Sequence, residues 1–253
     1  MTISTKNILA DGRWSGMHGI GRFSTEVLSR LEHTDIIETG PAPLSLQNIV
    51  WQIKQLQQHK KKHHVFFTPG FNPVLYSPIP YIVTIHDLIH LFAPGNAQLQ
   101  QKLYYQFLIK PTIKRARYVF TVSEYSKKII SEWANIPADK IINVSCGLSE
   151  RLTHHGEKYV PGYPYLLHVG NAEKSHKNIE RLLHAFTKTK TDRNLRLIFT
   201  GKFSDALHEI ARKNHLQNRI VFTNKKSDEE LAKRYRGAEA VVFPSLYEGF
   251  GLP

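Results

Sequence analysis

The chain has 253 residues, of which 34 are Lys or Arg and 21 are Asp or Glu, so its formal net charge is +13. Hydrophobic residues make up 41%, which is enough for a folded core and excludes wholesale disorder. No apolar run reaches the roughly 18–20 residues that span a bilayer, and a single cysteine, Cys146, excludes an intrachain disulfide scaffold and a cysteine-based zinc cluster.

In the first half of the chain, short apolar runs alternate with helical patterns. Ile20, Phe23, Val27, Leu28 and Leu31 share one helical face, which predicts a helix after the first strand. Apolar runs without alternation are typical of strands buried on both faces, so we predict a parallel sheet covered by helices. The predicted strands are residues 7–9, 65–67, 81–85, 118–122 and 141–144.

The second half repeats this alternation after a stretch, 147–164, that is rich in Gly, Pro and charged residues. Strands are predicted at 165–169, 195–200, 220–223 and 240–243, with Ser227 as the N-cap of a helix whose capping-box residue is Glu230. We therefore predict an α/β protein with domains at 1–150 and 165–253 and a linker at 151–164. The second sheet is incomplete, so either the chain is a fragment or another chain completes it.

The loop after the first strand carries Gly16, Gly19 and Gly21 immediately before a helix. Glycines there allow backbone N–H groups to approach an anion at the positive end of the helix. The spacing is neither a dinucleotide fingerprint nor a P-loop, so an ordinary tight turn is the alternative.

Residues 84–87, Thr-Ile-His-Asp, end a buried strand. His86 is a candidate to donate a hydrogen bond to a substrate hydroxyl or carbonyl, with Asp87 orienting its ring. The alternative is a structural histidine beside a helix-capping aspartate.

Two loops of the second half carry further candidates. After the last strand, Glu248 stands beside Gly249 and Gly251, where a carboxylate suits sugar hydroxyls and bare glycine amides suit phosphate oxygens. After residue 169, Lys177 is a candidate to neutralise a diphosphate, unless it faces solvent, and Asn178 is a candidate N-cap.

Four stretches together resemble the retaining GT-B glycosyltransferases of the GT4 family, and especially its mannosyltransferase-like branch in bacterial polysaccharide assembly. They are the glycines running into IGRFSTEVL, then TIHDLIHL, VGNAEKSHKNIERLLHAF and VVFPSLYEGFGLP. The resemblance implies two Rossmann-like, doubly wound domains that face each other across a cleft. In the family the N-terminal domain binds the acceptor and the C-terminal domain binds a nucleotide-sugar.

The resemblance also implies site residues. The glycine-loop positions near the donor phosphates are Gly19 and Gly21. His86 would contact the transferred sugar, Lys177 the diphosphate and Glu248 the sugar ring. The backbone segment beside the sugar and phosphates would be Phe250, Gly251 and Leu252. The chain departs from the family at Asn171, where an Arg is frequent, with Lys174 or His176 as substitutes. The second glutamate of the E-x7-E motif would be position 256, beyond Pro253.

The function implied is transfer of a hexose with retention to a saccharide or lipid-linked acceptor, without a metal. GDP-mannose is the first choice of donor, and UDP-glucose and dTDP-rhamnose stay open. The rival interpretation is a truncated and inactive remnant. A nucleic-acid-binding protein is disfavoured because no known nucleic-acid-binding module is found.

We expect a cytoplasmic protein, because the N-terminus lacks the pattern of a secretory signal. The excess of positive charge is compatible with a peripheral position at the inner membrane. Residues 98–117 combine Leu99, Leu103, Phe107 and Ile113 with five basic residues and are a candidate to lie against anionic lipid. The alternative is a core-facing helix with a basic outer face.

Overall fold

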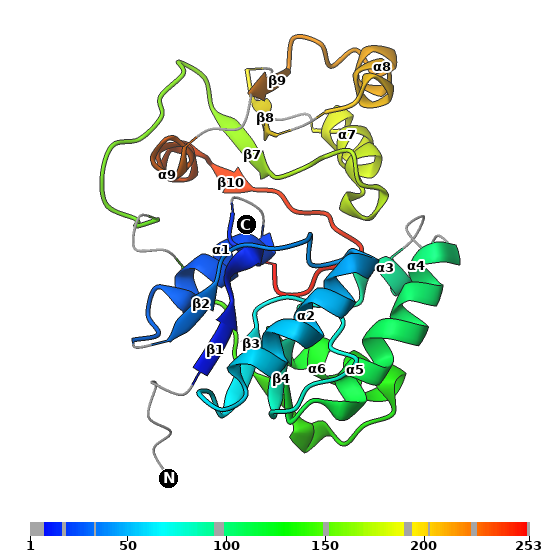
Figure 1. Ribbon diagram of the computed structural model, residues 1–253. Helices are drawn as coiled ribbons and strands as arrows, with labels where there is room; N and C mark the ends of the chain where they lie inside the picture. Colours follow the sequence, from blue (N-terminus) through cyan, green and yellow to red (C-terminus); the bar gives the residue numbers. More distant parts are fainter. Residues whose placement is uncertain are drawn as a thin grey trace. The chain divides into compact units, whose positions relative to one another are not determined.

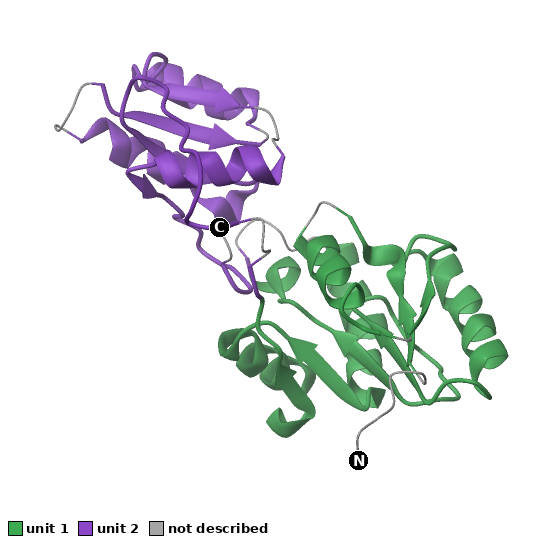
Figure 2. Cartoon of the chain, turned by 90° about the vertical axis from the view of Figure 1, so that its left-hand side faces the viewer, with its two compact units in different colours: residues 1–92, 97–146 green, residues 93–96, 147–253 purple. Residues whose placement is uncertain are grey.

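The computed structural model describes residues 8–16, 19–32, 34–93, 99–148, 152–189, 194–201, 203–223 and 227–251. The chain divides into two compact units, each of which is described by itself (Figure 2). Unit 1 comprises residues 1–92 and 97–146, and unit 2 comprises residues 93–96 and 147–253. No helix among the described residues is long and apolar enough to cross a membrane.

Unit 1 is built on a parallel sheet with the strand order β2-β1-β3-β4-β5-β6 (Figure 1). Its strands are β1 (Ile8–Asp11), β2 (Asp35–Ile37), β3 (Val65–Thr68), β4 (Tyr81–Thr84), β5 (Tyr118–Thr121) and β6 (Ile141–Asn143). Its helices are α1 (Gly19–Leu28), α2 (Leu46–His59), α3 (Ile89–Phe92), α4 (Leu99–Tyr104), α5 (Lys110–Arg115) and α6 (Glu124–Ala134). A π-helical segment, Tyr105–Ile109, joins α4 to α5, and short 3-10 turns occupy Gly12–Trp14 and Ala138–Lys140.

The sheet of unit 1 buries apolar side chains on both faces. In β3, Phe66 belongs to the cluster that contains Leu56 and Val83, whereas the next residue, Phe67, packs with Leu28 of α1. Successive residues of a strand point to opposite faces, so a strand with a core on each side needs a continuous apolar run. For this reason, apolar and polar residues do not alternate along the strands of the unit.

Unit 2 has a smaller parallel sheet with the order β10-β7-β8-β9. Its strands are β7 (Tyr165–Val169), β8 (Arg196–Thr200), β9 (Ile220–Thr223) and β10 (Ala240–Val241), and its helices are α7 (Ile179–Thr187), α8 (Asp205–Lys213) and α9 (Asp228–Gly237), with a 3-10 turn at Ser175–Lys177. Ser227 caps α9 by accepting a hydrogen bond from the backbone N–H of Glu230, which confirms the predicted cap.

The predicted α/β class with two doubly wound parallel sheets is confirmed, and each predicted strand has a counterpart within a few residues. The prediction missed β2, because three residues with one acid at the sheet edge leave no apolar run to detect. Residues 152–164 contain no helix or strand.

Strand order reverses at one place in each sheet. In unit 1 the chain moves from β1 to β2 on one side and then to β3 on the other, and in unit 2 it returns from β9 to β10 on the far side of β7. Ligands of open α/β sheets bind outside the carboxyl ends of the strands at such reversals. A ligand is therefore expected at the loops that follow β1, β3 and β4 in unit 1, and β7 and β10 in unit 2.

Candidate functional site

The loop after β1 is anchored by a buried ion pair. Both carboxylate oxygens of Asp11 accept hydrogen bonds from the guanidinium of Arg13, at 2.8 Å from Nε and 2.7 Å from Nη2. Arg13 also donates through Nη1 to the Pro41 carbonyl and to Asn48 Oδ1, at 2.8 Å each, and its guanidinium lies over the ring of Trp51. Charged groups this deeply buried are held only where such partners are present. Sequence reasoning missed this pair, although an Asp at the end of a buried strand was a signal.

The two glycines predicted to lie near a phosphate differ in their surroundings. A Cβ atom on Gly21 would stand 2.7 Å from the carbonyl oxygen of Gly16, so the backbones of α1 and of the preceding loop approach too closely for any side chain. A Cβ atom on Gly19, the first residue of α1, would meet nothing within 4 Å. Close packing against the preceding loop therefore requires a glycine at position 21. At Gly19, the space beside the first residue of this 10-residue helix is open.

His86 follows β4 and is held by a backbone carbonyl from the end of β3. Its Nε2 lies 2.9 Å from the carbonyl oxygen of Pro69, and Phe23 of α1 meets the ring edge-on. A carbonyl oxygen only accepts hydrogen bonds, so Nε2 carries the proton. Burial lowers the pKa of His86 below 6.5, partly opposed by the Pro69 carbonyl and the charge of Asp87, so the ring is neutral near pH 7.

This geometry corrects the expected chemistry of His86. We predicted that a ring N–H of His86 would donate a hydrogen bond to the substrate, but the N–H at Nε2 donates to the Pro69 carbonyl. In a neutral ring the other nitrogen, Nδ1, is then a hydrogen-bond acceptor. His86 can therefore accept a hydrogen bond from a hydroxyl group and is unsuited to contact a phosphate oxygen. Asp87 accepts a hydrogen bond from the backbone N–H of Ile89 at 2.9 Å, so it takes the helix-capping role that was the alternative.

In unit 2, the loops after β7 and β10 meet through a salt bridge. Nζ of Lys177 lies 2.6 Å from Oε1 of Glu248, and the two side chains are 15% and 28% exposed. Nζ of Lys177 also lies 4.5 Å from the centre of the Phe243 ring. The two residues were predicted separately from loops 71 positions apart, and the reversal of strand order beside β7 brings them together.

Two hydrogen bonds fix the β10 loop against the β7 loop. The side-chain nitrogen of Asn178 donates to the Pro244 carbonyl over 3.1 Å, and the backbone N–H of Leu246 donates to the His176 carbonyl over 2.7 Å. Asn178 is the N-cap residue of α7, as predicted, but its side chain accepts no capping hydrogen bond from the helix. Its amide is used to join the two loops instead.

His168 lies behind the salt bridge and was not predicted as a site residue. It is fully buried near the end of β7, stacked on Phe243 with ring centres 5.7 Å apart, and neither ring nitrogen has a hydrogen-bond partner. Burial, together with repulsion from Lys177, lowers the pKa of His168 to about 4. A histidine inside an apolar strand was the signal that would have drawn attention to it.

The remaining predicted residues follow Glu248 in the sequence. Phe250 is exposed, Gly251 has a left-handed backbone with φ of +85°, and Leu252 lies outside the described residues. In the β7 loop, Asn171 accepts a hydrogen bond from the backbone N–H of Glu173, Lys174 is exposed and His176 is buried. Of the two proposed substitutes for an arginine, Lys174 is thus the one whose side chain faces solvent.

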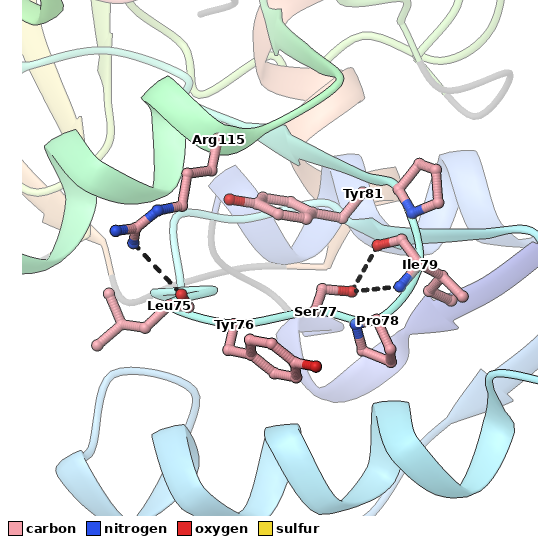
Figure 3. Close-up of a pocket in the computed structure, with 8 residues that line it drawn as sticks. Leu75, Tyr76, Ser77, Pro78, Ile79, Tyr81 and Arg115 are labelled. Atoms are coloured by element: carbon pink, nitrogen blue, oxygen red, sulfur yellow. Dashed lines mark hydrogen bonds between the residues drawn. The ribbon is translucent and has the colours of Figure 1, made fainter.

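A separate cavity of about 520 Å³ lies away from these loops, at the amino end of β4 (Figure 3). It is lined by residues 75–81 and Arg115, and a guanidinium nitrogen of Arg115 donates to the Leu75 carbonyl across it. Because β4 begins at this cavity and runs away from it, the cavity lies at the opposite end of β4 from His86. It has no part in the site built above.

Comparison with known protein families gives matches over both units. Residues 21–151 match the family model described as Glycosyltransferase Family 4, and residues 152–253 match the model described as Glycosyl transferases group 1. The first of these covers just over half of the chain.

Curated relatives include two O-antigen chain mannosyltransferases. The chain is 32% identical over 178 residues to O-antigen chain mannosyltransferase RfbU of Salmonella typhimurium, a match that covers 68% of this chain and 47% of the relative. It is 27% identical over 193 residues to O-antigen chain mannosyltransferase B of Escherichia coli, covering 68% of this chain and 49% of the relative. The chain thus spans about half the length of these relatives.

Solved structures with the same fold include two enzymes with low sequence identity to this chain. Sucrose-phosphate synthase of Thermosynechococcus elongatus matches 97% of this chain and 77% of its own, with a TM-score of 0.72 and 17% identity. Lipopolysaccharide outer core galactosyltransferase WaaB matches 97% of this chain and 75% of its own, with a TM-score of 0.65 and 14% identity. At this identity the likeness concerns the fold alone.

Proposed function

Because the chain belongs to glycosyltransferase family 4, we propose that it takes part in transferring a hexose from a nucleoside diphosphate sugar to a saccharide or lipid-linked acceptor, with retention at the anomeric carbon. Mannose is the hexose we propose and GDP-mannose the donor, because both curated relatives described above are named as O-antigen chain mannosyltransferases. The same relatives support a role in bacterial O-antigen or related polysaccharide assembly.

The salt bridge between Lys177 and Glu248 carries this proposal. A nucleotide-sugar joins a diphosphate, which needs a cation, to a sugar, whose hydroxyl groups suit a carboxylate. The bridge supplies one of each at the reversal of strand order in unit 2, with both side chains partly open to solvent. During transfer, negative charge grows on the departing diphosphate, and a fixed ammonium group beside it would stabilise the transition state.

For unit 1 we propose the acceptor-binding role, together with a contact between His86 and a hydroxyl group of the transferred sugar. The acceptor character of Nδ1 supports this assignment, because a sugar hydroxyl can donate to it. Gly19 and Gly21 are proposed to lie near the donor phosphates, which the open start of α1 supports.

Isothermal titration of the chain with GDP-mannose, UDP-glucose and dTDP-rhamnose tests the donor assignment. A titration with GDP alone separates the contribution of the nucleotide to binding from that of the sugar. We expect Lys177→Gln to weaken GDP-mannose and GDP alike, by about tenfold or more, since a hydrogen bond to a charged group is lost. Glu248→Gln should weaken GDP-mannose by a similar factor. It should leave GDP binding unchanged or tighter, because Lys177 loses its competing partner.

Glu209 and Lys213 provide a matched control, because they form an exposed ion pair on α8 of the same unit. Glu209→Gln and Lys213→Gln should leave donor affinity unchanged. Normal GDP-mannose binding by the Glu248→Gln variant would overturn the assignment of that carboxylate. A chain that binds none of the three donors is the result expected of an inactive remnant.

A further inference from the structure

The turn that follows β3 supplies the backbone carbonyl that His86 contacts. β3 and β4 are neighbours in the sheet, so the residues that follow β3 lie beside those that follow β4 (Figure 1). The carbonyl oxygen of Pro69 accepts a hydrogen bond from Nε2 of His86 over 2.9 Å. Residues 69–72 belong to no helix or strand, so the direction of this carbonyl depends on the side chains that hold the turn.

Asn72 is the centre of a buried hydrogen-bond network at this turn. Its side chain is fully buried. Its Oδ1 accepts hydrogen bonds from Nε1 of Trp14, over 2.9 Å, and from the hydroxyl of Thr68. Its Nδ2 donates to Oδ2 of Asp11 over 3.3 Å. These partners belong to the end of β1, the 3-10 turn after it and the end of β3, so Asn72 joins the turn after β3 to two paired strands.

Close packing fixes the residue next to Pro69. A Cβ atom on Gly70 would lie 2.3 Å from Cε2 of Trp14, so the backbone of Gly70 is in contact with the indole ring and only glycine fits there. The same indole donates its N–H to Asn72, and the hydroxyl of Thr68 lies 3.2 Å from the Gly70 carbonyl. The residues on both sides of Pro69 are therefore held by one network. Because the proline ring also fixes φ, the Pro69 carbonyl is left with little freedom to turn.

We propose that Asn72 is a positioning residue for His86. By holding the turn, it keeps the Pro69 carbonyl against Nε2, so that the proton stays on this nitrogen and Nδ1 stays available as a hydrogen-bond acceptor. Asn72 acts through the backbone of residues 69–71 and needs no contact with the ring. That Nδ1 receives a sugar hydroxyl rests on the proposed function, whereas the effect of Asn72 on the ring does not.

Asn48 provides a matched control, because it is a second fully buried asparagine of unit 1. Its Oδ1 accepts a hydrogen bond from Nη1 of Arg13 over 2.8 Å, and its Nδ2 donates to the Pro43 carbonyl over 2.9 Å. Neither partner belongs to the turn after β3. Each asparagine thus contributes a donor and an acceptor to a buried network, and replacement by alanine should lower stability in both cases. Only the replacement of Asn72 should alter the ring of His86.

NMR of the histidine rings tests the proposal in the whole chain. Long-range proton–nitrogen correlation spectra near neutral pH distinguish a protonated ring nitrogen from an unprotonated one, and a His86→Gln variant identifies the signals of His86 among the 14 histidines. The original chain should carry the proton on Nε2. In Asn72→Ala, the tautomer protonated at Nδ1 should become about fivefold more populated, the factor expected for one lost hydrogen bond between neutral groups. Asn48→Ala should leave the His86 signals unchanged.

Trp14→Phe is a second test, which decides the matter if circular dichroism shows that Asn72→Ala does not fold. It removes the N–H that Asn72 accepts and keeps an aromatic ring beside Gly70, so the tautomer should shift in the same direction by a smaller factor. Unchanged His86 signals in the folded variants would overturn the inference. An equal shift in Asn48→Ala would do the same, because a general loosening of unit 1 would then be the cause. A tautomer shift in a chain that binds no nucleotide-sugar would support the positioning role and overturn only the proposed function.

Discussion

At the end of β1 in unit 1, a carboxylate and a guanidinium are paired out of contact with water, whereas the ammonium and carboxylate that meet after β7 and β10 in unit 2 are partly exposed. Asp11 and Arg13 have side chains 0% and 5% exposed, against 15% and 28% for Lys177 and Glu248. Burial makes the first pair indispensable to its own loop, because either charge alone would be stranded. Exposure leaves the second pair free to exchange partners with a ligand.

The same contrast extends to the histidines of the two units. His86 is fixed by a backbone carbonyl, which settles its tautomer and leaves one nitrogen for a ligand. His168 is buried behind the salt bridge without a partner for either nitrogen. His86 is thus held in place by a hydrogen bond, whereas the ring of His168 is kept neutral to a lower pH by burial and by the positive charge of Lys177.

The largest effect on the free energy of unfolding is expected from breaking the ion pair of unit 1. Arg13→Met leaves the Asp11 carboxylate buried without its guanidinium, and should lower the free energy of unfolding by about 3–5 kcal/mol. All three tryptophans, Trp14, Trp51 and Trp133, lie in unit 1, so urea unfolding followed by tryptophan fluorescence reports this unit. Adding Asp11→Asn removes the stranded charge and should restore much of the loss. A loss below about 1 kcal/mol would show that water reaches the carboxylate.

A loss of stability of intermediate size is expected at acid pH, because of His168. Its pKa falls from 6.5 to about 4 on folding, so above pH 6.5 the ring is neutral in both states. Between these values the unfolded chain binds a proton that the folded chain refuses, so the free energy of unfolding falls as pH falls. The expected loss is about 1.4 kcal/mol per pH unit, on the order of 3 kcal/mol by pH 4.

Hydrogen exchange of the β7 and β8 amides, corrected for the intrinsic effect of pH, measures this dependence. The His168→Phe variant should lose the acid-dependent part while matching or exceeding the original stability at neutral pH, since it carries no unpaired ring nitrogen. An NMR titration gives the direct check. A His168 ring that titrates near 6.5 would mean that water enters behind Phe243, and the contrast between the units would weaken.

Most of the fold could be predicted from the sequence, because strands buried on both faces are continuous apolar runs. Phe66 and Phe67 illustrate this, since each enters a different core. The edge strand β2 could not be predicted, because its pairing with β1 depends on the backbone and little on its three side chains. Individual residues of the candidate site were proposed from the sequence, but the contacts between them were not.

The missed connections share a physical cause. The hydrogen-bond partner of His86 is a backbone carbonyl 17 positions upstream. Because every residue has a backbone carbonyl, no side chain in the sequence indicates which one is the partner. The position of Asp11 at the end of a buried strand was a signal, but only the folded chain shows that Asp11 and Arg13 form a buried pair. Lys177 and Glu248 were each assigned a ligand group, yet their contact with each other depends on the strand order of the second sheet.

The smallest expected change in stability sharpens the comparison most. Lys177→Met removes the same kind of charge as Arg13→Met, but from a pair in contact with water, so the free energy of unfolding should change by no more than about 1 kcal/mol. Hydrogen exchange of the β7 amides measures it. A double-mutant cycle with Glu248→Gln should give a coupling energy of similar size. A loss of several kcal/mol would show that the bridge holds unit 2 together. Weaker donor binding by the Lys177 variant would then report unfolding and not a lost contact with phosphate.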